Sequence, residues 1–153
     1  MDAATVFSIL IACPSCGAKN RVPAPHLADT GRCGSCKSTL PPLAEPLEVD
    51  ASAFHEIVSS AKVPVLADFW APWCGPCRIA APEVHKLANA MRGRALVIKV
   101  NTEDHPELAN HCGIQSIPNF LVFRGGRAVF RRAGVASNGE MQHWIAQAAR
   151  TPL

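Results

Sequence analysis

The sequence lacks several features that would assign it to common classes. No apolar run approaches the roughly 20 residues that a transmembrane helix needs, so we expect no membrane association. There is no glycine-rich dinucleotide fingerprint, so we expect no bound flavin or nucleotide. The formal net charge is only +3, too small to indicate binding to nucleic acid or to a membrane surface. We expect a monomer.

We also expect no export signal in the first residues. Leu10-Ile11-Ala12-Cys13 resembles a lipoprotein cleavage box, but no Lys or Arg precedes it and Asp2 does. Cleavage there would turn Cys13 into a lipid anchor. The odd count of seven cysteines argues against a fully disulfide-paired secreted protein. We therefore expect a cytoplasmic location.

The 153 residues divide into a short cysteine-rich module and a domain of ordinary size. Residues 1–40 carry two Cys-x-x-Cys pairs and few long apolar runs, so this segment needs a metal ion or disulfide bonds to fold. Residues 41–46, Pro-Pro-Leu-Ala-Glu-Pro, indicate a stiff linker. Residues 47–153 have the pattern of an α/β domain.

Strands and helices alternate along that domain. The pattern predicts strands at 47–49, 63–70, 95–101, 119–123 and 128–133. Helices are expected from a cap at Asp50 or Ser52 to 61, over 74–91 with an interruption at Pro82, over 106–112, and from a cap at Asn138 to 149. This order predicts a mostly parallel sheet with an antiparallel edge, flanked by helices.

Four cysteines have the spacing of a zinc ribbon: Cys13-x-x-Cys16, 16 intervening residues, then Cys33-x-x-Cys36. Four thiolates complete a tetrahedral shell around one Zn²⁺ and leave no open position, so the site should be structural. Metal binding would supply on the order of 10 kcal/mol of folding free energy.

Two other interpretations of this module stay open. The four cysteines could form two disulfides, or the ribbon could bind nucleic acid. The second is disfavoured because residues 1–40 carry a net charge of only +2, which a zinc tetrathiolate cancels, and Phe7 is their only aromatic residue.

The third pair, Cys74-Gly75-Pro76-Cys77, follows a buried strand and opens a helix. The free N–H groups and the positive dipole end of a helix favour a thiolate at Cys74. Cys77, three residues on, lies on the same helical face and can close a disulfide. We predict that Cys74 attacks a target disulfide and that Cys77 resolves the resulting bond; the alternative is a structural disulfide.

Asp68 lies within an otherwise apolar strand, where desolvation raises the pKa of a carboxyl group. We predict that it is the general base for Cys77, and that Lys99 on the neighbouring strand pairs with it. The alternatives are an ordinary salt-bridged aspartate and a solvated lysine at a strand end.

The segment from Asp68 to Cys77, Asp-Phe-Trp-Ala-Pro-Trp-Cys-Gly-Pro-Cys, resembles the active site of the thioredoxin family. The similarity covers residues 47–150. With its cysteine-rich module, the chain resembles the zinc-binding second type of bacterial thioredoxin. Further matches are the helix-kinking proline, the third-strand lysine, the cis-proline turn and two late glycines: Pro82, Lys99, Ile117-Pro118, Gly126 and Gly134.

The resemblance implies a thioredoxin fold with strand order 1-3-2-4-5 and a zinc ribbon at one end. It implies disulfide-containing protein substrates, recharging by an NADPH-dependent thioredoxin reductase, and a role in electron transport. It also implies a cis peptide bond at Pro118 and an Ile117 backbone that pairs with substrate. The remaining substrate contacts would form a flat apolar rim around an exposed sulfur: Trp73, Gly75, Pro76, Gly134 and Val135.

The chain departs from the family pattern at Asn119, where Thr is usual, and at Cys112, where an aromatic residue is common. We interpret Cys112 as a buried filler, with a regulatory thiol as the alternative. Trp144 and Ile145 are predicted core residues. A disulfide oxidase or isomerase, a zinc-dependent binding module and zinc release on oxidation remain alternative functions.

Overall fold

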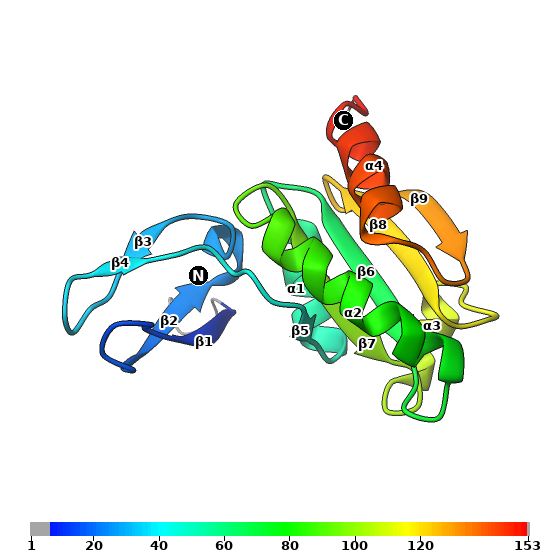
Figure 1. Ribbon diagram of the computed structural model, residues 1–153, viewed down its shortest axis with the longest axis horizontal. Coiled ribbons are helices and arrows are strands. Elements are labelled where there is room, and N and C mark those ends of the chain that lie inside the picture. Colours follow the sequence, from blue (N-terminus) through cyan, green and yellow to red (C-terminus); the bar gives the residue numbers. More distant parts are fainter. Residues whose placement is uncertain (1–6, 153) are drawn as a thin grey trace.

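The computed structural model describes residues 7–152, which form a small β-module followed by an α/β domain (Figure 1). Residues 1–6 of the predicted module and residue 153 of the predicted domain lie outside the described part. The module contains two antiparallel hairpins and one 3-10 turn: β1 (Ser8–Ala12), β2 (Lys19–Pro23), η2 (Ala24–His26), β3 (Gly31–Arg32) and β4 (Thr39–Leu40).

The domain is built on a five-stranded sheet in the order β5-β7-β6-β8-β9. This is the predicted order 1-3-2-4-5, and it is confirmed. The strands β5, β7 and β6 are parallel, whereas β8 and β9 form an antiparallel edge. Their bounds are β5 (Leu47–Glu48), β6 (Val65–Trp70), β7 (Leu96–Asn101), β8 (Asn119–Arg124) and β9 (Arg127–Ala133).

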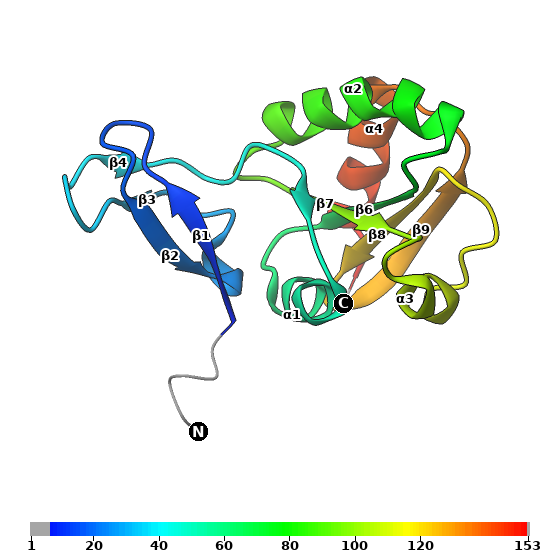
Figure 2. The same cartoon turned by 90° about the horizontal axis from the view of Figure 1, so that it is seen from below.

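Four helices cover both faces of the sheet. Figure 2 shows α2 and α4 on one face and α1 and α3 on the other. Strand β6 therefore buries both of its faces: Phe69 packs in the core under α1, and Leu66 packs in the core under α2. The helix bounds are α1 (Ala51–Ser60), α2 (Gly75–Ala90), α3 (Pro106–His111) and α4 (Asn138–Ala149). Among residues 7–152, no helix is both long enough and apolar enough to cross a membrane.

Two helix details differ from the sequence-based expectations. Helix α2 runs through Pro82 without a break. Proline removes one hydrogen bond, but Ala80 and Val84, on either side of it, are fully buried against the sheet and hold both halves in place. The cap of α4 is Ser137 rather than Asn138, because Ser137 forms a reciprocal capping box with Glu140. The cap of α1 is Asp50, one of the two residues expected.

The β-module docks on the domain through apolar side chains. Ala24 and Leu27, each 2% exposed, share one core with Phe54 of α1. The expected linker is tied to the module, since the N–H of Leu43 donates a hydrogen bond to the carbonyl oxygen of Leu27 at 3.0 Å. The module also approaches the chain just after α2, because the carbonyl oxygen of Ala28 lies close to Gly93, as does Pro42 of the linker.

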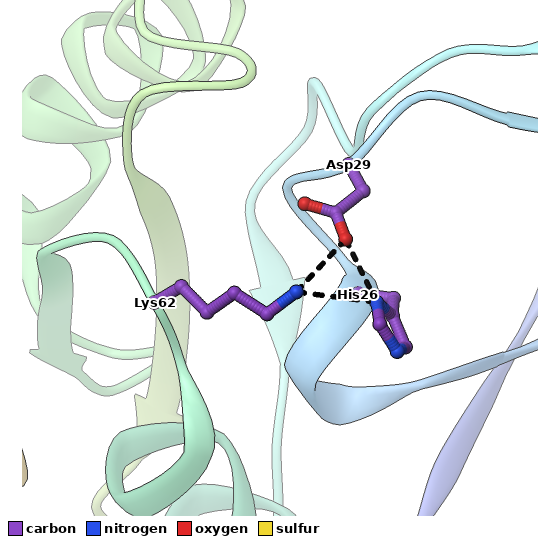
Figure 3. Close-up of polar contacts among 3 residues, drawn as sticks. All are labelled: His26, Asp29 and Lys62. Carbon is purple, nitrogen blue, oxygen red and sulfur yellow. Dashed lines mark hydrogen bonds and ion pairs between the residues drawn. The ribbon is translucent and has the colours of Figure 1, made fainter.

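A polar cluster lies at the edge of this interface (Figure 3). The Lys62 ammonium, in the loop between α1 and β6, lies 3.2 Å from Asp29 Oδ2. His26 Nδ1 contacts the same oxygen at 2.7 Å. All three side chains are about half exposed, so the apolar contacts around Leu27 carry most of the docking free energy.

Candidate active site and candidate metal centre

Cys74 and Cys77 form a disulfide at the start of α2, with Cα atoms 5.3 Å apart. Cys74 is the N-cap residue of the helix, and the N–H of Cys77 donates a hydrogen bond to its sulfur at 3.2 Å. This N–H has no partner within the helix, so it is free to stabilise negative charge on the Cys74 sulfur. The local geometry therefore favours Cys74 as the thiolate of the pair.

Cys74 is only 4% exposed in this disulfide state, which corrects the expectation of an exposed sulfur. The sulfur is linked to Cys77 and packs against Ala71, Trp70 and Ile117, which together cover it. The side chain of Trp73, in contrast, is 67% exposed beside it.

The structure gathers the residues expected to form the substrate rim. The Ile117–Pro118 peptide bond is cis, as predicted. The Ile117 carbonyl oxygen lies 3.8 Å from the Cys74 sulfur. The N–H of Gly134 donates to the Pro118 carbonyl oxygen at 2.9 Å, which places Val135 at the same edge. Gly75 and Pro76 are exposed in the first turn of α2.

Sequence reasoning missed one member of this apolar surface. Ile79 is 66% exposed, although it is a large aliphatic residue. It follows Pro76 by three positions on α2, so both lie on one helical face. That spacing was the available signal. Val135 is a second exposed aliphatic residue, at 49%.

Asp68 is buried in β6, with 2% of its surface exposed, and its Oδ1 atom has no hydrogen-bond partner among the described residues. Burial raises the pKa of its carboxyl group to about 7, although the positive charge of Lys99 opposes this shift. A carboxyl group with that pKa can accept and release a proton at neutral pH.

Lys99 was expected to pair with Asp68, but the structure shows a different ion-pair partner. The lysine ammonium lies 4.0 Å from Glu48 Oε2 and 4.7 Å from the centre of the Trp70 ring. The lysine side chain is only 15% exposed, and its ammonium lies toward Glu48 on the edge strand β5. Among the described residues, its ion-pair partner is therefore Glu48, which sequence reasoning did not single out.

The four module cysteines converge on one point. Their sulfur atoms all lie within 4.8 Å of one another, and Cys13–Cys36 and Cys16–Cys33 are each separated by 3.7 Å. A tetrahedron of sulfurs at about 2.3 Å from zinc has edges of about 3.8 Å, so the arrangement fits Zn²⁺. None of the four is in a disulfide, which disfavours the alternative of two disulfides.

Hydrogen bonds in the module favour a thiolate at Cys33. At Cys16 a backbone hydrogen bond from Ala18 is outweighed by hydrogen bonding to Cys36 and by burial, which raise the pKa to about 11. The backbone amides of Ser15 and Ser35 donate to the sulfurs of Cys13 and Cys33 at 3.4 and 3.3 Å. Backbone donation from Cys36, followed by side-chain donation from Asn20, lowers the pKa of Cys33 to about 6.

Asn20 also ties the two cysteine knuckles together. Its Oδ1 atom accepts a hydrogen bond from the backbone N–H of Gly34 at 2.8 Å, while its Nδ2 donates to Cys33 at 3.5 Å. Sequence reasoning did not identify this residue, because an Asn within a strand carries no metal-site signal of its own.

The remaining residues singled out from the sequence lie in the core or at its edge. Trp144 and Ile145 are 4% and 1% exposed on α4, as predicted. Cys112 is half-buried after α3, and burial raises the pKa of its thiol. Asn119 is 5% exposed, and its Oδ1 has no hydrogen-bond partner among residues 7–152.

Comparisons with known proteins cover both parts of the chain. A family model described as thioredoxin matches residues 45–147, and one described as the N-terminal region of thioredoxin 2, a zinc ribbon, matches residues 12–38. Thioredoxin C-3 of Corynebacterium nephridii is 38% identical over 139 residues, covering 91% of this chain and 94% of that protein. Thioredoxin of Haemophilus influenzae is 32% identical over 69% of this chain and 98% of its own length.

The comparison with solved structures also finds thioredoxins. A mutant thioredoxin from Halobacterium salinarum superposes with a TM-score of 0.65 at 29% identity, over 72% of this chain and 96% of its own. Chloroplastic thioredoxin z gives 0.63 at 26% identity, over 68% and 94% of the two chains.

Proposed function

This chain belongs to the thioredoxin family of thiol–disulfide oxidoreductases, and from that premise we propose that it is a protein-disulfide reductase acting through Cys74 and Cys77. One observation carries the proposal. Cys74 caps α2 and accepts a hydrogen bond from the N–H of Cys77, while Ile117 of the cis-proline turn borders its sulfur.

The reaction proceeds in two exchanges. The Cys74 thiolate attacks one sulfur of a target disulfide, a Cys74–target bond forms, and the other target sulfur leaves as a thiolate that takes up a proton. Cys77 then attacks the Cys74 sulfur and releases the second target thiol. Two electrons and two protons have then passed to the target, and the Cys74–Cys77 disulfide remains.

Asp68 serves as the proton acceptor for Cys77 in the second exchange. Desolvation raises the pKa of its carboxyl group to about 7, so at neutral pH about half of the molecules hold the carboxylate that can take the thiol proton. Lys99 moderates that basicity through its charge. Asp68 Oδ1 has no hydrogen-bond partner among the described residues, so it can accept a hydrogen bond from a water molecule that relays the proton.

The apolar rim would bind the target. An extended segment of the substrate pairs with the Ile117 backbone, and its side chains rest on the exposed surfaces of Trp73 and Val135. Gly75, Pro76, Pro118 and Gly134 complete the floor without projecting long side chains over the disulfide.

The N-terminal cysteines would hold one structural Zn²⁺. Bound there, the ion would supply folding free energy that the short hairpins lack. The ligands are the four sulfurs that the structure brings together: Cys13, Cys16, Cys33 and Cys36. We further propose domain limits of 1–40, 41–46 and 47–153, which follow from the composition and the proline-rich linker, and a cytoplasmic location, which follows from the cysteine pattern. Electron transfer from an NADPH-dependent thioredoxin reductase follows from the family resemblance.

The test is reduction of insulin disulfides by the full-length protein with dithiothreitol as electron donor. We expect Cys74→Ser to lose the activity and Cys77→Ser to accumulate mixed disulfides with insulin. Cys112→Ser is the matched control, since its thiol lies outside the exchange, and it should retain the rate. Equal activity of Cys74→Ser and the unmodified protein would refute the proposal.

A further inference from the structure

Three charged residues form one row across the sheet. Glu48 of β5 is the register partner of Lys99 on β7, and Lys99 is the register partner of Asp68 on β6. Register partners on neighbouring strands lie about 5 Å apart and point to the same face. The row runs from the sheet edge, where the Glu48 side chain is 55% exposed, to the interior, where Asp68 is 2% exposed.

Lys99, the middle residue of this row, directs its ammonium toward Glu48 at the outer end. The Lys99 ammonium contacts the Glu48 carboxylate at 4.0 Å and stacks over the Trp70 ring at 4.7 Å. At the inner end, Asp68 Oδ1 has no hydrogen-bond partner among the described residues. The cation is thus shared between two carboxylates and contacts the outer one.

An ammonium stabilises an ionised carboxylate more strongly the closer it lies. Contact with Glu48 keeps Lys99 from approaching Asp68, and the negative charge of Glu48 itself opposes ionisation of Asp68. Both effects disfavour ionisation of Asp68. We propose that Glu48 is a positioning residue: its carboxylate restrains Lys99, and this keeps Asp68 able to take up and release a proton at neutral pH. The role rests on the proposed function of Asp68 as proton acceptor for Cys77.

The other groups around Asp68 do not replace this effect. The Cys77 sulfur, in the first turn of α2, does not titrate in the disulfide state. The register partner of Asp68 on β8 is Phe120, and the buried residues of α4 in this core are uncharged. Asp104 and His105 border Glu48 around a hollow of about 470 Å³, and they remain unchanged when Glu48 is replaced.

The experiment compares Glu48→Gln with the unmodified full-length, zinc-loaded protein in its oxidised state. The carboxyl ¹³C shift of Asp68 is followed by NMR as a function of pH, and the resonance is assigned by its absence in Asp68→Asn. We expect the titration midpoint to fall by about half a unit to one unit in Glu48→Gln. The matched control is Glu56→Gln on α1, which removes the same charge from the other face and should leave the midpoint in place.

A midpoint that stays unchanged or rises in Glu48→Gln would overturn the proposal, as would an equal fall in Glu56→Gln. Glu48→Asp, which keeps the charge on a shorter side chain, should restore part of the shift. Insulin reduction separates this result from the proposed function. A lowered midpoint in a protein that does not reduce insulin supports the positioning role and refutes the reductase function, whereas an active protein with an unmoved midpoint refutes only the role of Glu48.

Discussion

Replacing Asp68 with Asn should change how the stability of the protein depends on pH. An aspartate in an unfolded chain titrates near 3.8, whereas burial raises the pKa of Asp68 to about 7 in the folded protein. Between these pH values the folded protein holds a proton that the unfolded chain has released. Its free energy of unfolding therefore falls as pH rises through this window, and it levels off above the folded pKa.

The size of the effect follows from the two pKa values. Each pH unit within the window costs about 1.4 kcal/mol, so the fall between about pH 5.5 and 8.5 is about 2 kcal/mol, and about four-fifths of it occurs below pH 7. Asn has a similar shape and no ionisation, so Asp68→Asn removes this contribution. At the higher pH the variant should be more stable than the unmodified protein.

Urea unfolding of both oxidised proteins at the two pH values measures this difference. All other titrating groups, including the zinc ligands, are common to the two proteins and cancel in the comparison. Parallel pH dependences would show that Asp68 ionises normally in the folded state. Its proposed role as proton acceptor near pH 7 would then fail with the stability argument.

Three further predictions concern the module and the rim. Leu27→Ala should lower the free energy of unfolding by about 2 to 5 kcal/mol, because it removes a buried side chain from the shared core. Lys62→Gln should lower it by less than about 1 kcal/mol, because its ion pair is half exposed. Urea titration measures both changes, and equal costs would contradict docking through apolar contacts. Removing zinc with a chelator should abolish amide-exchange protection in β1 to β4 and leave the rate of insulin reduction nearly unchanged. The module contacts the chain beside Gly93, whereas the dithiol lies at the start of α2, about 24 Å away along a 16-residue helix. A large loss of rate would show that the zinc site acts on the dithiol. Val135→Ser should raise the KM for insulin several-fold and leave reduction of a small aromatic disulfide unchanged, because the rim contacts only extended substrates; an equal effect on both substrates would exclude that role.

The domain fold was predictable because its signals are local and consistent. The apolar segments 63–70 and 95–101 indicated strands buried on both faces, and the observed strands Val65–Trp70 and Leu96–Asn101 are central in the sheet. The element order then fixed the topology. The capping of α4 by Ser137 was missed because Ser137 and Asn138 are both good caps, and only the contact with Glu140 decides between them.

The interactions inside the site were less predictable, since they depend on register between distant segments. Sequence reasoning placed Lys99 beside Asp68, and the register confirms that they are neighbours. It could not show that a two-residue strand would bring Glu48 to the other side of Lys99. The burial of Cys74 was missed for a similar reason, since the covering residue Ile117 comes from another part of the chain.

The three Cys-x-x-Cys pairs show that spacing alone does not decide what a cysteine does. After Cys13 and Cys33 the chain turns back through left-handed residues, Gly17 with φ of 77° and Lys37 with φ of 65°. Each turn brings its pair of sulfurs toward the other pair, so four thiolates can share one cation. After Cys74 the chain continues instead into a helix, whose free N–H groups stabilise a single sulfur. The backbone around each pair therefore separates metal ligands from a redox nucleophile. Gly17 and Pro76 signal this difference in the sequence, whereas Lys37 in the second turn does not.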